Sequence, residues 1–156
     1  KTKVLTSRIA NIVEKNLGIP NTFIWSPDNS KFYFADTTDG SLLEYNFNLD
    51  DGSLSDKKVF FDFERGLPDG STIDSEGYIW NCRWGGSCVV RIDPNGNIDQ
   101  IYELPVENVT NCVFGGSDLK TLYITTAFNK GKHQYDGSLF ALNLTIPGLE
   151  DNKFKI

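Results

Sequence analysis

The sequence lacks methionine altogether, and its 156 residues include one histidine and no long apolar run. A transmembrane helix needs about 20 mostly apolar residues in a row, so we expect no association with a membrane. No leader with a basic start, an apolar middle and a small-residue cleavage site is visible. Because the chain starts at Lys1 rather than at methionine, we expect it to be cut from a longer protein, which leaves an upstream leader open.

Positive charge is also scarce. The chain has 15 lysine and arginine residues against 21 aspartate and glutamate residues, which gives a formal net charge of −6 at pH 7. A protein that binds nucleic acid needs a basic face to contact the phosphates. The charge balance therefore argues against a nucleic-acid partner and favours a protein with acidic loops.

Cysteine is limited to three residues, Cys82, Cys88 and Cys112. They form no Cys-x-x-Cys pair and have no histidine nearby in sequence, so a zinc cluster is not indicated. We expect three half-buried thiols on strands. An odd number of cysteines without a pairing pattern fits a reducing compartment, and the predicted location is the cytoplasm.

The chain does contain a short pattern that occurs twice and recurs a third time in degenerate form. In the two full copies, a proline precedes Asn21 or Asp69, and a polar turn and a new apolar run follow. Thr110 occupies the equivalent position in the third copy, so the spacings are 48 (69 − 21) and 41 (110 − 69) residues. Such periods, built from short strands, indicate a β-propeller. Equivalent positions of its blades surround one axis, where Asn21 and Asp69 are suited to share a cation.

Strand patterns dominate between these copies. The Asp39-Gly40 pair between two apolar runs predicts a hairpin, and residues 22–63 are predicted to form four strands, one complete blade. The second and third units are expected to begin with inner strands at Ser71 and Cys112. The other predicted strands cover residues 31–36, 41–47, 57–63, 78–83, 87–93, 98–104, 121–126 and 137–142.

Residues 1–18 are predicted to form the outer strands of an earlier blade, with Leu17-Gly18 as its exit; a short amphipathic helix over residues 8–16 is the alternative. The fold class is then all-β, with about three and a half blades in a single partial propeller domain, residues 1–156. Closed propellers typically have four to eight blades, and an open end exposes unpaired strand edges. We therefore expect a longer protein or a partner.

Eight motifs, in order and with short gaps between about residues 18 and 154, resemble the SMP-30/gluconolactonase/luciferin-regenerating-enzyme family. They are Pro20-Asn21 with Trp25-Ser26-Pro27-Asp28, Tyr33-x-Ala35-Asp36, Gly66-Leu67-Pro68-Asp69-Gly70, Asp74-x-Glu76-Gly77-x-x-Trp80, Trp84-Gly85-Gly86 with Val89-x-Arg91-x-Asp93-Pro94-x-Gly96, Leu104-Pro105-Val106, Phe114-Gly115-Gly116-x-Asp118-Leu119-x-Thr121 to Thr125, and Gly137 to Leu142.

The resemblance implies a six-bladed propeller with one divalent metal (Ca²⁺, Zn²⁺, Mn²⁺ or Mg²⁺) in its central channel. Asn21 and Asp69 match two of the family's metal ligands. The family's N-terminal half, with a glutamate ligand and an arginine and an asparagine that contact substrate, has no counterpart in this chain. The chain thus looks like a C-terminal half whose missing N-terminal half is its partner. It departs from the family at Thr22, where glycine is usual, and at Asn111, where serine is usual.

The implied activity is metal-dependent hydrolysis of a sugar lactone to the aldonic acid, a gluconolactonase-like reaction. The metal polarises the carbonyl and lowers the pKa of a bound water, and Asp69 is the predicted catalytic base. We expect the 156-residue chain alone to be inactive. One alternative is a Ca²⁺-binding regulatory propeller of the same family with little turnover. The other is an interaction propeller in which Asn21 and Asp69 only form turns.

Further polar and aromatic residues have structural interpretations. His133 lies in a polar loop and is expected at the surface. Trp84 is expected to pack within a blade, with a platform for a sugar as the alternative. The aspartates that follow or interrupt strands are expected to cap turns: Asp28, Asp36, Asp74, Asp93 and Asp118.

Overall fold

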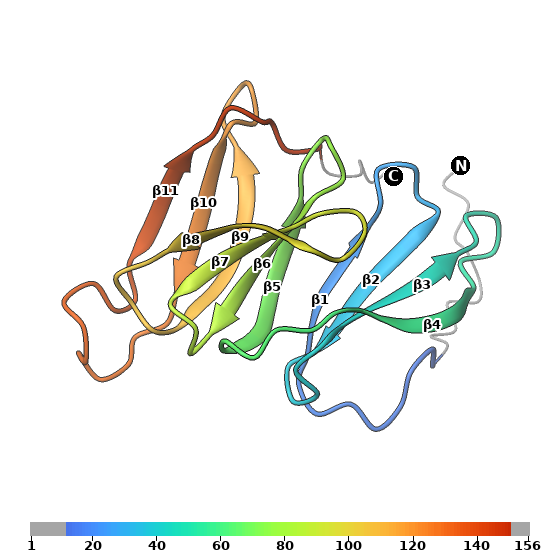
Figure 1. Ribbon diagram of the computed structural model, residues 1–156, viewed down its shortest axis with the longest axis horizontal. Helices are drawn as coiled ribbons and strands as arrows, with labels where there is room; N and C mark the ends of the chain where they lie inside the picture. The colour runs from blue at the N-terminus through green and yellow to red at the C-terminus, as the bar shows by residue number, and fades with distance from the viewer. Residues whose placement is uncertain (1–11, 151–156) are drawn as a thin grey trace, which may run out of the picture.

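The protein consists of eleven β-strands between residues 12 and 150, the part of the chain that the computed structural model describes. They form three antiparallel sheets that follow one another along the chain (Figure 1). No helix occurs between residues 12 and 150, which confirms the all-β prediction. The same range accordingly contains no helix long and apolar enough to cross a membrane.

The first sheet contains four strands in the order β1-β2-β3-β4. This confirms the predicted four-stranded unit over residues 22–63, with shifted bounds. The last strand was predicted over residues 57–63 but starts earlier and ends before Asp62 and Phe63. The strands are β1 (Pro20–Trp25), β2 (Lys31–Asp36), β3 (Leu42–Phe47) and β4 (Leu54–Phe61).

The second sheet has the order β5-β6-β7-β8 and the third the order β11-β10-β9. The inner strands were expected to begin at Ser71 and Cys112 but begin at Leu67 and Val109, so the Pro-Asp-Gly motif is inside a strand. Their bounds are β5 (Leu67–Ile73), β6 (Ile79–Trp84), β7 (Cys88–Ile92), β8 (Ile98–Glu103), β9 (Val109–Gly115), β10 (Thr121–Thr126) and β11 (Leu139–Asn143).

The segment before β1 differs from the prediction. Residues 12–18 form neither a strand nor a helix, so the outer strands expected there are absent from that stretch, as is the end of the alternative helix. The rest of both predictions falls on residues 1–11, which lie outside the described residues. This segment is held instead by Asp36, whose carboxylate accepts hydrogen bonds from the main-chain nitrogens of Gly18 at 2.6 Å and Ile19 at 2.9 Å.

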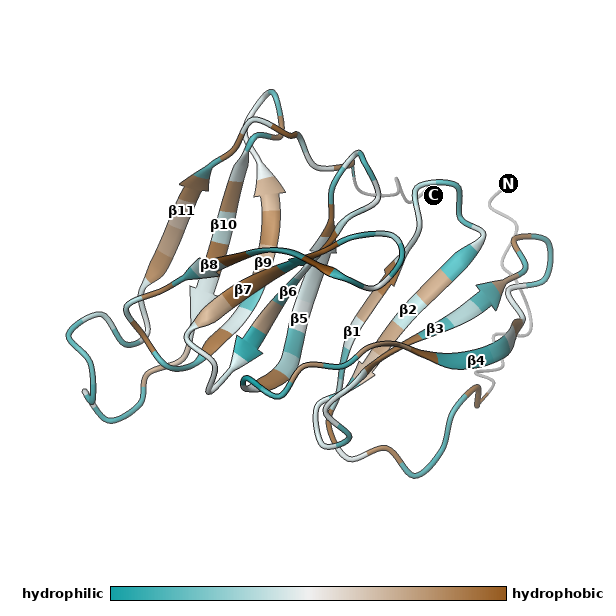
Figure 2. Ribbon diagram, viewed as in Figure 1, coloured by the Kyte–Doolittle hydropathy of each residue, from teal (hydrophilic) through white to brown (hydrophobic). Residues whose placement is uncertain are grey.

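The core consists of two apolar clusters, one on each side of the second sheet. Alternate residues of a strand point to opposite faces, and every residue of β7 is buried. Val90 and Ile92 belong to the cluster shared with the first sheet, whereas Val89 belongs to the cluster shared with the third. In Figure 2 the brown, apolar residues run along β7 and recur on strands of the other two sheets. The second sheet is thus packed on both faces.

All three cysteines contribute to this core. Cys82 and Cys88 are completely buried and Cys112 is 4% exposed, so the expectation of half-buried thiols was wrong. Each is a free thiol. Cys82 and Cys88 are buried because the second sheet is covered on both sides, and Cys112 is buried because β9 packs against that sheet. The local strand pattern did not reveal this packing.

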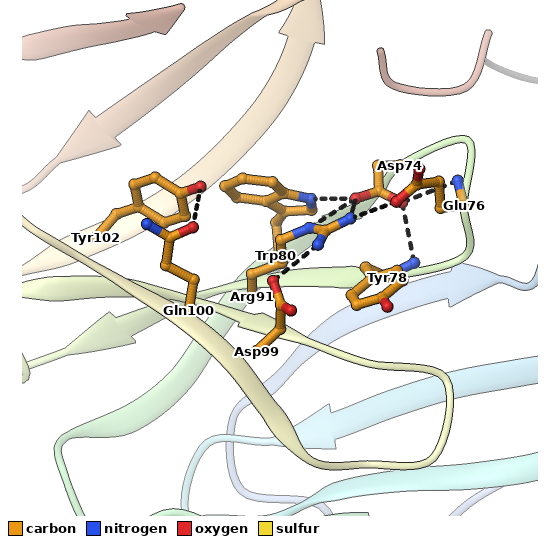
Figure 3. A network of polar contacts seen from close by, with 8 residues as sticks. All are labelled: Asp74, Glu76, Tyr78, Trp80, Arg91, Asp99, Gln100 and Tyr102. Atoms are coloured by element: carbon orange, nitrogen blue, oxygen red, sulfur yellow. Dashed lines mark hydrogen bonds and ion pairs between the residues drawn. The ribbon is translucent and has the colours of Figure 1, made fainter. Parts of the chain in front are cut away.

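A charged network fastens the end of β5 to its sheet (Figure 3). Asp74 is completely buried and accepts hydrogen bonds from the Trp80 indole at 2.9 Å and from the Arg91 guanidinium at 2.8 Å. Arg91 also pairs with Asp99 at 2.7 Å and lies 3.6 Å from the centre of the Tyr78 ring. The capping role predicted for Asp74 is confirmed, since its carboxylate also accepts from main-chain nitrogens in the following turn.

Candidate functional site

The three positions that the repeat predicts to be equivalent occupy equivalent places in the structure. Each lies at a β-bulge in the first strand of its sheet, where the pairing register with the next strand shifts. The shifts fall between Pro20 and Phe23, between Pro68 and Ser71, and between Val109 and Asn111. A bulge redirects side chains at a point where regular pairing stops. Asn21 and Asp69 are therefore bulge residues, and the interpretation of their motifs as turns is wrong.

The bulges of the first and second sheets lie against each other, because β5 packs beside both β1 and β9. Two threonines of the first sheet connect them. The Thr37 hydroxyl donates a hydrogen bond to the carbonyl oxygen of Pro68 at 2.7 Å, and the Thr22 hydroxyl donates to the carbonyl oxygen of Asp69. Both threonines are buried, at 7% and 2% exposure. Two successive carbonyls of the β5 bulge are thus bound to the first sheet.

Asn21 is half-buried at the start of β1. Its amide nitrogen donates a hydrogen bond to the Thr37 hydroxyl oxygen at 2.7 Å. Its carbonyl oxygen Oδ1 has no hydrogen-bond partner within the described residues. That oxygen is free to bind a ligand.

Asp69 is half-buried in the neighbouring bulge. Burial raises the pKa of its carboxyl group above the ordinary value, and a hydrogen bond from the Gly70 main-chain nitrogen partly opposes this rise. No lysine or arginine between residues 12 and 150 forms an ion pair with it. A partly desolvated carboxylate without a cationic partner is suited to hold a cation or to accept a proton.

A polar pocket of about 190 Å³ opens between the bulges, with the residues of all three first strands in its wall. Gly70 forms part of the wall and lies directly against Asn111 of β9. A larger apolar hollow of about 530 Å³ adjoins it and shares Asn21 with it. The residues of the polar pocket are Pro20, Asn21, Thr22, Phe23, Gly70, Ser71 and Asn111.

The donor set fits a hard divalent cation but does not complete its coordination. A carboxamide oxygen and a carboxylate are ligands that Ca²⁺, Mg²⁺ and Mn²⁺ accept, and Zn²⁺ also accepts carboxylate oxygen. The described part of the chain contains no group of three histidine, cysteine, aspartate or glutamate side chains able to hold a metal. Asn21 and Asp69 would thus supply two ligands, and further ligands would have to come from elsewhere.

The third repeat position contributes differently. Thr110 also lies at a bulge, but its hydroxyl contacts the Thr125 hydroxyl at 2.8 Å within the same sheet. The pocket is lined from this sheet by Asn111, one residue later. The degenerate third copy therefore supplies a wall rather than an equivalent donor.

The other candidate residues lie apart from the pocket. His133 is exposed in the loop between β10 and β11, as predicted. Trp84 is 39% exposed at the end of β6, which is more exposure than blade packing predicts. Arg83 is fully buried and donates to the carbonyl oxygens of Phe63 and Gly66 at 2.8 and 2.7 Å, and to Asn81.

The remaining aspartates bind their own turns, which confirms their predicted capping roles. Asp36 accepts hydrogen bonds from Thr38 and from the chain before β1, and these hold the pKa of its carboxyl group well below the ordinary value. The hydroxyl of Ser26 and the nitrogen and hydroxyl of Ser30 lower the pKa of Asp28 to about 2. Asp93 and Asp118 accept from main-chain nitrogens two residues onward.

Sequence reasoning missed the residues that hold the two donors in place. No site role was predicted for Thr37, Ser71 was named only as a strand start, and Thr22 was noted only as a departure from glycine. Their roles depend on the pairing of Pro20 with Asp36 and on the contact between β1 and β5. A polar residue directly after the predicted strand end at Asp36 was the only local signal for Thr37.

Comparisons with known proteins identify the family of the chain. The SMP-30/Gluconolactonase/LRE-like region matches residues 3–128. Pentonolactonase XacC of Haloferax volcanii is 39% identical over 135 residues, covering 85% of this chain and 45% of that protein. The putative sugar lactone lactonase YvrE of Bacillus subtilis is 36% identical over 152 residues, covering 91% and 52%.

Among solved structures, the calcium-binding protein regucalcin of Agrobacterium tumefaciens superposes with a TM-score of 0.84 at 31% identity. The likeness covers 90% of this chain and 51% of that one. The chain thus spans about half the length of the relatives it matches. With a family match over residues 3–128, the chain belongs to the SMP-30/gluconolactonase/LRE-like family.

Proposed function

We propose that the complete protein is a metal-dependent lactonase that opens a sugar-derived lactone to its aldonic acid, with Asn21 and Asp69 as metal ligands. The observation that carries the proposal is the meeting of two β-bulges. One contains Asn21, which lines the polar pocket and has a free carboxamide oxygen, and the other contains Asp69, whose carboxylate has no ion pair within residues 12–150. Relatives named as a pentonolactonase and as a putative sugar lactone lactonase support the substrate class.

The chemistry assigns separate tasks to the two residues. A bound divalent cation supplies Lewis acidity for the lactone carbonyl and lowers the pKa of water. Asp69 orients the attacking water and accepts its proton. The water oxygen bonds to the carbonyl carbon, the ring C–O bond breaks, and the proton passes to the departing ring oxygen. Asn21 contributes a neutral ligand.

The proposed architecture is a six-bladed propeller of which this chain provides about half. The first strands β1, β5 and β9 would surround the central channel, and the partner would be the N-terminal half with the remaining ligands. Support comes from the apolar hollow on the first sheet, which includes Trp25, Phe32, Phe34 and Phe47. Such an aromatic face favours contact with another sheet. The proposed location stays the cytoplasm, which the three free thiols favour.

A second candidate function is Ca²⁺ binding without turnover. The likeness to a solved structure described as a calcium-binding protein, regucalcin, supports it. Both candidates use the same donors, because oxygen ligands suit Ca²⁺. They differ in whether Asp69 acts as a base.

Metal analysis and lactone hydrolysis test the proposal together. Elemental analysis of the freshly purified complete protein should find close to one divalent cation per chain. Hydrolysis of pentono- and hexonolactones should disappear on chelation and return with Ca²⁺, Mn²⁺, Mg²⁺ or Zn²⁺. One bound cation without hydrolysis would support the second candidate, whereas failure of all four ions to bind would overturn both.

A further inference from the structure

The Thr37 hydroxyl has two partners and only one proton. Its oxygen lies 2.7 Å from the carbonyl oxygen of Pro68 and 2.7 Å from the side-chain amide of Asn21. A carbonyl oxygen only accepts, so the Thr37 proton must point to Pro68. Thr37 can then only accept from Asn21.

This fixes the orientation of the Asn21 amide. The nitrogen and oxygen of an asparagine side chain have nearly the same shape, and their assignment follows from the hydrogen-bond network. Since Thr37 has no proton to give, the Asn21 atom beside it must be the nitrogen. The oxygen Oδ1 is then turned away from Thr37 and stays without a partner in the described residues.

The same reasoning fixes the direction of a series of hydrogen bonds that ends at the Asp69 carbonyl oxygen. A guanidinium only donates, so Asn81 accepts from Arg83 at 3.0 Å with its oxygen and donates to the Ser71 hydroxyl at 2.9 Å with its nitrogen. Ser71 must then donate to Thr22 across 2.8 Å, and Thr22 donates to the Asp69 carbonyl oxygen. Every hydrogen-bond proton in this series points toward the Asp69 carbonyl oxygen.

We propose that Thr37 is a positioning residue of the metal site: it presents the Asn21 carboxamide oxygen to the cation and, with Thr22, binds the bulge that carries Asp69. This inference rests on the proposed function. Thr37 touches neither cation nor substrate and acts through Asn21 and the carbonyl of Pro68. Removing the hydroxyl lets the amide turn its nitrogen toward the pocket, where a cation is repelled.

The test compares Thr37→Val with Thr37→Ser in the complete protein by calorimetric titration with Mn²⁺ and Ca²⁺. Valine keeps the shape and removes the hydroxyl, whereas serine keeps the hydroxyl. We expect valine to weaken metal binding by about 10- to 100-fold, the usual effect of losing a residue that orients a ligand. Serine should stay within about threefold of wild type, well below that effect.

Measuring the same substitution in the Asn21→Asp variant distinguishes an effect on the orientation of the Asn21 amide from a general loosening of the fold. Asn21→Asp replaces the amide with a carboxylate whose two oxygens are equivalent, so no orientation has to be selected. Thr37→Val should then weaken metal binding at least about threefold less in the Asn21→Asp background than in the wild type, a coupling measured by a double-mutant cycle. An equal loss in both backgrounds would assign Thr37 a merely structural role and overturn the inference.

The outcomes distinguish this inference from the function on which it rests. A wild-type protein that binds neither cation refutes the proposed function. A wild-type protein that binds, together with a folded Thr37→Val variant of unchanged affinity, refutes the role of Thr37 alone. Where valine prevents folding, Thr37→Ala replaces it in the same cycle, with folding checked by circular dichroism.

Discussion

Gly70 lies so close to Asn111 that a β-carbon added to Gly70 would fall 2.2 Å from Oδ1 and 2.8 Å from the β-carbon of Asn111. Gly70 follows Asp69 in the β5 bulge, and Asn111 belongs to β9 of the next sheet. The contact therefore connects the proposed metal ligand to the neighbouring sheet.

Gly70→Ala is expected to destabilise the protein by about 1–3 kcal/mol, the usual cost of overpacking, and to weaken metal binding by displacing Asp69. The cause is crowding and not backbone strain, because Gly70 does not adopt a positive φ. Asn111→Gly in the same chain should recover part of the loss, since it removes every side-chain atom that the new β-carbon meets. Urea unfolding and metal titration measure the two effects. Equal stability of Gly70→Ala and wild type would contradict the packing described here.

Asp69→Asn retains the shape of the side chain and an oxygen ligand but removes the charge and the base. We expect lactone turnover to fall by at least about 10²-fold, the contribution of a general base, with the fold intact. Steady-state kinetics with saturating metal separates lost chemistry from lost binding. Asp62→Asn, an exposed residue outside the pocket, is the control and should retain wild-type rates. Near-normal kcat in Asp69→Asn would place the base elsewhere.

Arg91→Met should lower the free energy of unfolding by about 3 kcal/mol or more, because it leaves a buried carboxylate without its cation. The side chains of Arg91 and Asp74 are 7% and 0% exposed. Lys132→Met is the matched control, since it breaks an ion pair with Glu107 whose side chains are 57% and 31% exposed. Exposed pairs contribute about 0–1 kcal/mol. Similar losses in both variants, measured by denaturant unfolding, would contradict the structural role of this network.

Asp36→Asn should lower the free energy of unfolding at pH 7, and this loss should become smaller as the pH falls. Hydrogen bonds from the Thr38 side chain and from the main-chain nitrogens of Ile19 and Gly18 depress the pKa of the folded Asp36 carboxyl group. A carboxyl group whose pKa is depressed in the folded state stabilises the fold at every pH above its pKa in the unfolded state, which is about 3.9. This contribution is lost as the pH falls toward the pKa of the folded state. The difference between wild type and variant should therefore narrow below about pH 4.

Asp39→Asn is the control for this experiment, since the exposed Asp39 carboxylate accepts no hydrogen bond from residues 12–150. Its stability should follow that of wild type at every pH. The measurement is the unfolding free energy of all three proteins between pH 7 and pH 3. A difference between wild type and Asp36→Asn that grows on acidification would contradict the prediction.

The sequence was sufficient for much of the fold because short strands and their turns are encoded locally. The hydrophobic run and the Asp39-Gly40 pair place β2 and β3 within a residue of their observed bounds. The start of β5 was misplaced because Pro68 and Gly70 are typical of turns, whereas here they belong to a bulged strand. A bulge depends on pairing with the neighbouring strand, which residues 67–73 alone do not specify.

Of the candidate site, only the residues at equivalent positions of the repeat could be predicted. Equivalence of position identified Asn21 and Asp69, and both lie at matching bulges. Thr22 and Thr37 could not be identified, since their partners are main-chain carbonyls of another sheet. Every residue has a main-chain carbonyl, so a sequence does not show which of them accepts a side-chain hydrogen bond. The orientation of Asn21 depends on such a contact and so requires the structure.

The last prediction concerns the half-buried aromatic face of the first sheet. The apolar hollow of about 530 Å³ includes Phe23, which is 68% exposed, and Trp25, whose indole nitrogen is buried without a hydrogen-bond partner among residues 12–150. We expect the 156-residue chain expressed alone to self-associate through this face and to lack lactonase activity, because half of the proposed site is missing. Phe23→Glu should reduce self-association in analytical ultracentrifugation, whereas Phe128→Glu, which changes an exposed loop residue, should not. A monomeric chain with full activity would show that the site is complete without further sheets.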